Sequence, residues 1–114
     1  MTKKQREEMY QQNTNNRCIE IYNKSMEEYR DYKVSRKIKK FRKCTAETIE
    51  TQNYIFLRSY NTIVCVYDKK QNIVVDVLRY VYGYTATSTQ HIYKFFNDLR
   101  VANFGIAFLI WRDI

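Results

Sequence analysis

Apolar residues are distributed unevenly along the chain, and their spacing changes from helical to strand-like. They occupy 16 of the first 52 positions and 35 of the last 62, so the sequence predicts a core built mainly from the C-terminal half. The first half shows one stripe with steps of three and four, the spacing of a helix face: Ile19, Tyr22, Met26 and Tyr29. The polar stretch 11–16 before it predicts a break, with Asn15 or Asn16 capping the helix that follows.

A second apolar series begins after this stripe and is out of phase with it. Val34, Ile38 and Phe41 share one helical face, while the other faces carry lysines and arginines. This arrangement predicts a basic amphipathic helix over residues 33–43.

The second half contains runs of residues typical of strands and then returns to a helical period. NYIFLRS (53–59), TIVCVYD (62–68) and IVVDVLRYVYGYT (73–85) are rich in β-branched and aromatic residues, which favour strands. In the next segment Ile92, Phe95, Phe96 and Leu99 have helical spacing, and Thr87 with Gln90 forms a capping-box pattern that starts a helix at about Ser88. The closing FGIAFLIW (104–111) would be apolar on both faces of a strand, which predicts an interior strand that is covered on both sides.

These elements predict an α+β fold. We expect an antiparallel sheet of four or five strands with one packed helix, preceded by an N-terminal helical extension. The change in composition predicts a basic helical extension over residues 1–45 and an α+β core domain over residues 46–114.

The distribution of charge along the chain indicates where the protein contacts anions. The net charge is +8, and residues 30–43 hold eight basic groups against one acidic group, so almost all of the excess lies there. Such a cluster is typical of surfaces that contact phosphates, although a solvated helix face is the alternative. A membrane surface is less favoured because the apolar face lacks bulky anchors. The predicted binding residues are Lys33, Arg36, Lys37, Lys39, Lys40, Arg42 and Lys43.

Three tyrosines at alternate positions suggest a second contact. On a regular strand Tyr80, Tyr82 and Tyr84 would share the face turned away from the main core. There they could stack on bases, or the N-terminal helix could pack over them.

Other chemistry finds little support in the sequence. Cys18, Cys44 and Cys65 form no CxxC pair, which predicts reduced thiols and neither a metal site nor a disulfide framework. His91, the only histidine, is expected to be neutral and hydrogen-bonded near a helix start, without a recognisable nucleophile beside it. We therefore expect a protein without cofactor or enzymatic activity. No apolar run is long enough to cross a bilayer, so we expect no membrane association.

Two segments resemble a family of small uncharacterised phage and prophage proteins of low-GC Gram-positive bacteria. Its pattern runs approximately S-Y-N-T-x-V-A-x-Y-D and then Y-S-x-T-T-S-K-H-I-x-x-F. The matching positions are Ser59, Tyr60, Asn61, Thr62, Val64, Tyr67 and Asp68 in the first segment and Tyr84, Thr87, Ser88, His91, Ile92 and Phe95 in the second. Cys65 replaces the usual alanine, Thr85 replaces serine, and the spacer between the segments is longer. The resemblance covers about residues 55–97 and omits the basic segment; it implies a phage origin and a small α+β module, with no activity attached.

Together these features suggest a phage-encoded binding protein in the cytoplasm of the host cell. The leading hypothesis is contact with nucleic acid or a nucleoprotein through the basic segment, to inhibit a host defence nuclease such as a CRISPR complex. One alternative is a protein–protein module or homo-oligomer formed through residues 16–30. Another is a phage regulator that binds DNA.

Overall fold

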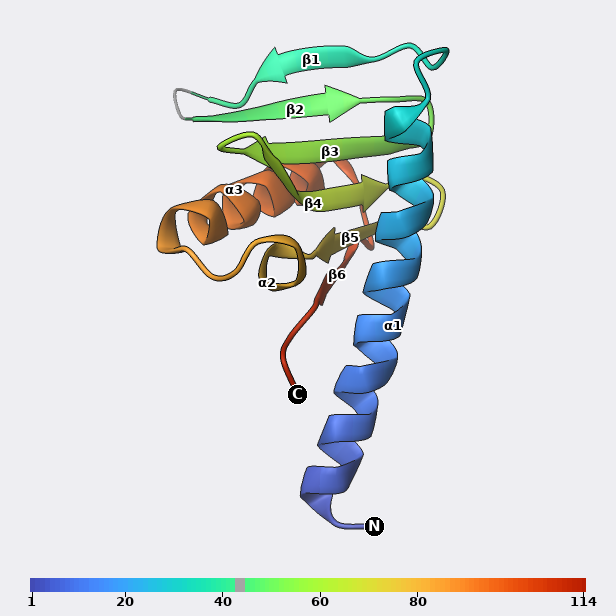
Figure 1. Ribbon diagram of the computed structural model, residues 1–114, viewed down its shortest axis with the longest axis vertical. Helices are drawn as coiled ribbons and strands as arrows, with labels where there is room; N and C mark the ends of the chain where they lie inside the picture. The colour runs from blue at the N-terminus through green and yellow to red at the C-terminus, as the bar shows by residue number, and fades with distance from the viewer. Residues whose placement is uncertain (43–44) are drawn as a thin grey trace.

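The structure is a six-stranded sheet with helices on both faces (Figure 1). The computed structural model describes residues 1–42 and 45–114. The helices are α1 (Lys3–Arg30), α2 (Leu78–Val81) and α3 (Ala86–Ala102). The strands are β1 (Lys37–Lys40), β2 (Ala46–Glu50), β3 (Tyr54–Ser59), β4 (Thr62–Asp68), β5 (Ile73–Asp76) and β6 (Ala107–Ile110).

The strands lie in the order in which they occur along the chain. The first five pair with antiparallel neighbours, and β6 then runs parallel to β5. A parallel pair needs a crossover connection, which α2 and α3 provide. The predicted α+β class is confirmed, but the sheet is mixed and has six strands. The prediction of an interior strand at 104–111 is wrong, because β6 lies at the edge of the sheet with a partner on one side only.

Two clusters of buried apolar side chains lie on opposite faces of the sheet. Cys18, Ile21 and Met26 of α1 pack with one face, around Phe56. Ile92 and Phe95 of α3 pack with the other. Since α1 is part of the first cluster, the core crosses the boundary that the sequence placed at residue 45. Tyr22, Met26 and Tyr29 of the predicted stripe pack in this cluster, and a homo-oligomer through residues 16–30 stays a prediction.

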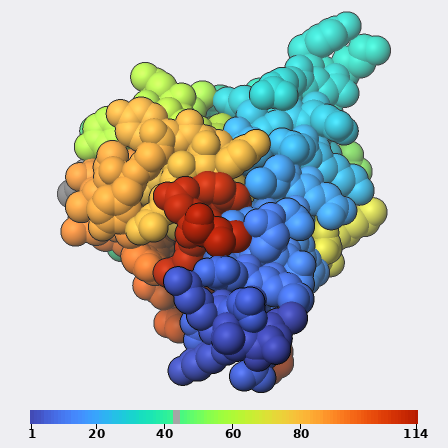
Figure 2. All heavy atoms as spheres, turned by 60° about the horizontal axis from the view of Figure 1, so that its bottom comes forward, coloured from blue at the N-terminus to red at the C-terminus, as the bar shows by residue number. Residues whose placement is uncertain are grey.

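The helix α1 is continuous through the stretch where a break was predicted. Thr2 caps it with a capping box to Gln5, and residues 11–16 lie inside it. Asn15 therefore does not cap a helix. It is 3% exposed, and its amide binds the backbone of Arg112 twice, donating to O (2.7 Å) and accepting from N–H (3.0 Å). The polar residues of this stretch do not break the helix. Two of them, Gln11 and Asn15, join it to the C-terminal segment, which lies beside α1 in Figure 2.

The predicted basic helix over residues 33–43 is wrong. The chain leaves α1 at Arg30, turns, and forms β1 at 37–40, where Ile38 lies opposite Ile49 of β2. Phe41 is buried, and its N–H donates to the carbonyl of Ala46. The spacing of the apolar residues fits a helix, but pairing with β2 satisfies the backbone of this segment and buries Phe41 in the α3-side core.

The predicted strand through the tyrosines is also wrong beyond Asp76. There β5 ends, the carboxylate of Asp76 accepts from the N–H of Leu78 (3.0 Å), and the short helix α2 follows. A loop then leads to α3, so the three tyrosines do not share a strand face.

The helix at 88–100 is confirmed, with a different start. It begins at Ala86, and Thr85 is the N-cap, accepting from the N–H of Ser88 (3.2 Å). The predicted capping box of Thr87 and Gln90 is wrong. Several residues of this segment have hydroxyl groups that can cap a helix, so the sequence pattern alone does not identify which of them is the N-cap.

The contact between Asn15 and Arg112 gives a stability prediction. Replacing Asn15 by Asp should lower the free energy of unfolding by about 1–3 kcal/mol, because a carboxylate cannot donate to the Arg112 carbonyl. Urea denaturation near neutral pH measures the loss. The control is Asn13→Asp on the exposed side of the same helix. Equal losses in the two variants would contradict the role of this contact.

Candidate functional site

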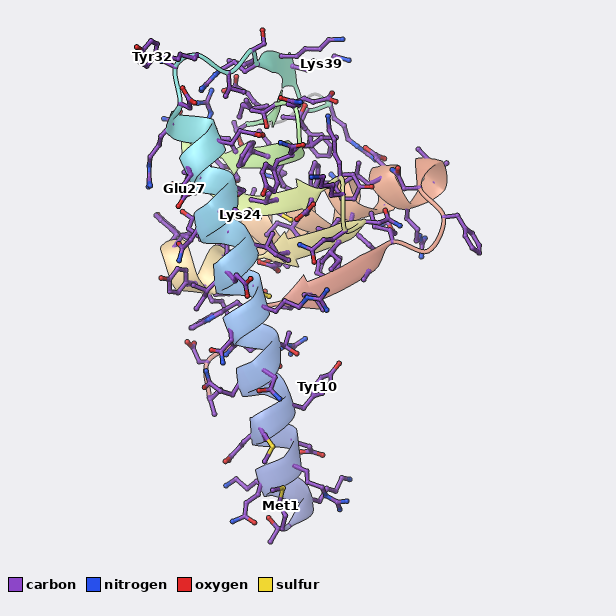
Figure 3. All side chains as sticks on the ribbon, turned by 90° about the vertical axis from the view of Figure 1, so that its right-hand side faces the viewer. Met1, Tyr10, Lys24, Glu27, Tyr32 and Lys39 are labelled. Carbon is purple, nitrogen blue, oxygen red and sulfur yellow. The ribbon has the colours of Figure 1, made fainter. Side chains whose placement is uncertain are left out.

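The basic segment lies at the end of the molecule opposite the N-terminus. In Figure 3, Lys39 and Tyr32 are at one end and Met1 is at the other. The residues directly after α1 project from the body of the molecule, and Tyr32 is 88% exposed. The strand β1 is the outermost strand of the sheet, and all four of its residues are exposed.

The three lysines of β1 carry charges that the rest of the described chain does not pair. Within residues 1–42 and 45–114, no ion pair or hydrogen bond holds the ammonium group of Lys37, Lys39 or Lys40. Glu50 and Glu47 lie opposite Lys37 and Lys40 in the strand register. Their carboxylates bind other cations.

Those other cations come from neighbouring strands. Glu47 pairs with Arg58 at 3.0 Å, and Glu50 pairs with Lys69 at 2.6 Å. The acidic groups nearest to β1 are thus already neutralised by β3 and by the turn after β4. The lysines of β1 are therefore unpaired cations, within the described residues, at the edge of the sheet.

The remaining predicted cations have structural contacts. Arg36 lies over the ring of Tyr29 (5.1 Å to its centroid) and donates to the Tyr29 carbonyl at 2.6 Å, which satisfies a free carbonyl at the end of α1. Arg42 pairs with Asp98 of α3 at 2.6 Å. Lys33 lies 5.9 Å from the ring centroid of Tyr32. Lys43 lies outside the described residues.

Shallow grooves run along both sides of β1. A groove of about 300 Å³ on the α3 side is lined by Lys37, Lys39 and Phe95, among others. A second groove, of about 490 Å³, extends from Lys40 past Arg58 to the turn at Tyr60 and Asn61. The basic strand is therefore connected to the β3–β4 turn by a continuous depression.

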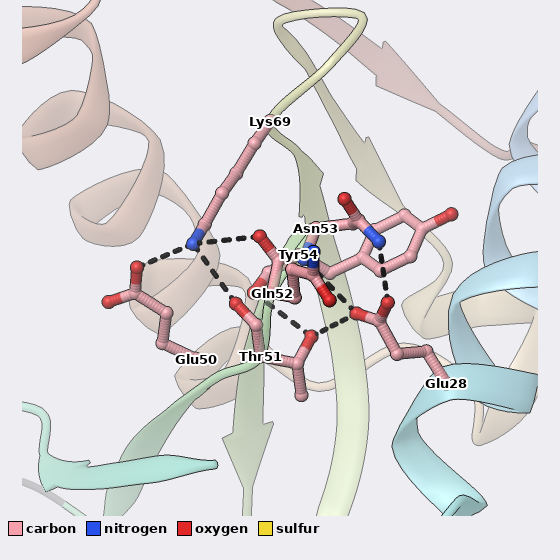
Figure 4. Close-up of polar contacts among 7 residues, drawn as sticks. All are labelled: Glu28, Glu50, Thr51, Gln52, Asn53, Tyr54 and Lys69. Carbon is pink, nitrogen blue, oxygen red and sulfur yellow. Dashed lines mark hydrogen bonds and ion pairs between the residues drawn. The ribbon is translucent and has the colours of Figure 1, made fainter. Parts of the chain in front are cut away.

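A polar cluster holds the start of the basic segment in place (Figure 4). Glu28, near the end of α1, accepts hydrogen bonds from the hydroxyl of Thr51 and from the side chain (2.7 Å) and backbone (3.2 Å) of Asn53. Burial alone would raise the pKa of Glu28, but these hydrogen bonds and the charge of Lys69 lower it below 4.5. The cluster joins the end of α1 to the β2–β3 turn, so it determines where the chain turns toward β1.

The predicted tyrosine contact is divided by the fold. Tyr80 packs against Trp111 (5.5 Å between ring centroids) and Tyr22 (6.2 Å), so it is partly used in packing. Tyr82 and Tyr84 are exposed, and the guanidinium of Arg79 lies 5.3 Å from the ring centroid of Tyr84. The three rings form no continuous stacking surface.

A cavity between the β3–β4 turn and the start of α3 was not predicted. It measures about 310 Å³ and is lined by Ser59, Tyr60, Thr62, Val64, Tyr82, Thr85, Thr87 and Ser88. Behind it, the buried hydroxyl of Ser59 bonds Ser88 (2.9 Å) and Nδ1 of His91 (3.0 Å). The two segments that carry the phage-protein resemblance both contribute to this cavity, which was the signal available in the sequence.

His91 has the environment of a neutral imidazole. Burial lowers its pKa, and the positive charge of Lys94 lowers it further. Its ring lies 6.1 Å from that of Tyr60. The histidine therefore links the β3–β4 turn to α3, in the second turn of the helix.

The other candidate chemistry is limited in the described residues. Cys18 and Cys65 are buried free thiols, and burial, with the nearby charge of Asp76, raises the pKa of Cys18 to about 12. Cys44 lies outside the described residues. Across residues 1–42 and 45–114, histidine, cysteine and carboxylate side chains form no cluster of three or more suited to a metal. No helix in the same ranges is both long and apolar enough to span a membrane.

Comparison with known proteins identifies a family without an assigned activity. Residues 11–104 match the sequence model of a family of unknown function, DUF8033, and the chain belongs to this family. The match includes α1 from residue 11 onward, the basic strand and the residues that line the hydroxyl-rich cavity. No curated protein and no solved structure matches the chain. The phage origin suggested by the resemblance stays a prediction.

The Glu28 cluster gives a pH-dependent prediction. A carboxylate whose pKa is lowered in the folded state stabilises the fold above its unfolded pKa, and this stabilisation is lost as the pH falls through the folded pKa. Glu28→Gln should therefore be less stable than wild type at neutral pH, with a difference that shrinks as the pH falls below about 4.5. Denaturation at a series of pH values measures the difference. The control is Glu27→Gln, on an exposed neighbour; a gap for Glu28→Gln that is constant down to acidic pH would contradict the role of the carboxylate.

Proposed function

We propose that this member of the DUF8033 family binds the phosphate backbone of nucleic acid through the outer edge of β1. The observation that carries the proposal is the set of three lysines, Lys37, Lys39 and Lys40, without ion-pair partners among the described residues, on one exposed strand. Binding releases the counterions condensed on the phosphates, which favours association without dependence on sequence.

The local geometry suits an extended polyanion. Successive side chains of a strand point to opposite faces, so Lys37 and Lys39 lie on one side of β1 and Lys40 lies on the other. A phosphate backbone that follows the edge would meet positive charge on both sides. The adjacent grooves have Lys40 and Arg58 in their walls. Arg36 and Arg42 contribute by fixing the segment at each end of the strand.

The partner suggested by the sequence is a nucleoprotein, including a CRISPR nuclease whose activity the protein would inhibit. That hypothesis requires the same surface, because such a complex presents nucleic-acid phosphates. A non-enzymatic role is part of the proposal.

Lysines also occur on edge strands for another reason. Charged side chains there keep sheet edges from pairing with other chains. This explanation needs no anion, and it predicts that removing the lysines promotes self-association without changing any affinity for nucleic acid. The two explanations are therefore separated by one set of variants.

The test uses charge neutralisation on β1 and measures binding of fluorescent single-stranded DNA and RNA over a series of salt concentrations. The triple variant Lys37→Gln, Lys39→Gln, Lys40→Gln should bind more weakly. Its slope of log affinity against log salt should be shallower by about 2, since each phosphate contact with a single strand contributes roughly 0.7.

The matched control is Lys3→Gln, Lys4→Gln, Lys24→Gln, which changes the net charge equally on α1, away from β1 (Figure 3). It should keep the wild-type slope to within the contribution of one contact. Absence of binding by the wild-type protein, or equal losses in the two triple variants, would contradict the proposal.

A further inference from the structure

We propose that the cavity between the β3–β4 turn and the start of α3 is a pocket for one unpaired nucleobase. This inference rests on the proposed function, because it assigns a second contact to the same nucleic-acid strand. It concerns a part of the surface that the basic segment does not include.

The lining of the cavity has an unusual composition. Seven of its eight lining residues carry hydroxyl groups, and the eighth is Val64. None of them is charged, so the cavity offers hydrogen-bond donors and acceptors without a counterion for a phosphate or carboxylate. It fits a neutral polar group. Its volume of about 310 Å³ lies at the lower end of the roughly 300–1,000 Å³ typical of small-ligand pockets.

Several of these hydroxyls are free to bind. Within the described residues, no hydrogen bond occupies the hydroxyls of Tyr60, Thr62, Tyr82 or Thr87. The hydroxyls of Ser59 and Ser88 are held at the inner end by each other and by His91. The cavity thus has a fixed inner wall and unoccupied polar groups nearer to solvent.

Two exposed aromatic rings border the cavity. Tyr60 is 58% exposed and Tyr82 is 69% exposed. Aromatic rings of this kind stack on nucleobases of any sequence, because every base has a flat π-face. A planar, neutral group with hydrogen-bonding edges satisfies both the rings and the hydroxyls.

The conformation of Tyr60 indicates that its ring is placed at a local cost. Tyr60 and Asn61 have φ angles of 49° and 69°, as in a tight two-residue hairpin turn. Asparagine and glycine suit such positions, whereas a bulky tyrosine is disfavoured there. The substitution Tyr60→Asn would ease the turn but remove the aromatic wall of the cavity.

The cavity is connected to the basic strand. Tyr60 also lines the groove that reaches Lys40 and Arg58. A single strand with one base in the cavity could therefore continue along this groove, with its phosphates over β1. This continuity favours a nucleobase over a free sugar, which would use the same hydroxyls and rings but has no need of the adjoining cations.

The test compares two single strands that have the same phosphates. One is abasic at every position, and the other carries a single adenine at its centre. Both strands are made once with deoxyribose and once with ribose. In at least one of these two series, the wild-type protein should bind the adenine-bearing strand about tenfold more tightly than the abasic strand. A factor of this order corresponds to one base–aromatic stack. Tyr60→Phe should keep this ratio. Tyr60→Asn should reduce the ratio of the two affinities to near one. The melting temperature of this variant should be at least that of the wild-type protein.

The outcomes separate the inference from the proposed function. Equal binding of both strands by the wild-type protein in both series would overturn the nucleobase pocket and leave the phosphate surface intact. A ratio that Tyr60→Asn does not change would also overturn it. If neither strand binds, the proposed function itself is overturned. The β1 triple-glutamine variant should bind both strands more weakly but keep the ratio between them.

Discussion

The packing of α1 against one face of the sheet determines where the rest of the functional surface lies. Cys18, Ile21 and Met26 bury the helix against the sheet, and Asn15 and Glu28 connect it to Arg112 and to the β2–β3 turn. The apolar contacts supply most of the stabilisation, and the polar contacts define the position of the helix. Because the end of α1 is held at this corner of the sheet, the chain that follows must turn back along the sheet edge.

After that turn the basic segment forms an exposed edge strand. A helix would spread these lysines around a cylinder, whereas the edge strand places Lys37 and Lys39 on one side of β1 and Lys40 on the other. The glutamates of β2 could have neutralised them, but Arg58 and Lys69 take those carboxylates. Local charge at the edge therefore depends on ion pairs formed by residues of β3 and of the turn after β4. The sequence of β1 supplies the lysines, and the ion pairs of Arg58 and Lys69 elsewhere in the sheet leave these lysines unpaired.

Elements with strong local signals were predictable, and those created by distant contacts were not. The spacing of Ile92 and Phe95 identified α3, and the β-branched and aromatic runs at 53–59 and 62–68 identified β3 and β4. In β1 only Ile38 is apolar, so nothing local distinguishes a strand from a helix until pairing with β2 supplies the partner. The location of the charge was readable from composition, while the hydroxyl-lined cavity needs Ser59 and His91 to meet across 32 positions.

NMR titration shows directly whether an anionic strand lies along β1. Isotope-labelled protein would be titrated with the fully abasic strand, which presents phosphates without bases. If the strand lies along β1, amide shift changes should be concentrated at residues 37–40, with smaller changes at the adjoining groove near Arg58. Changes confined to the N-terminal half of α1, or spread evenly over all exposed lysines, would contradict it.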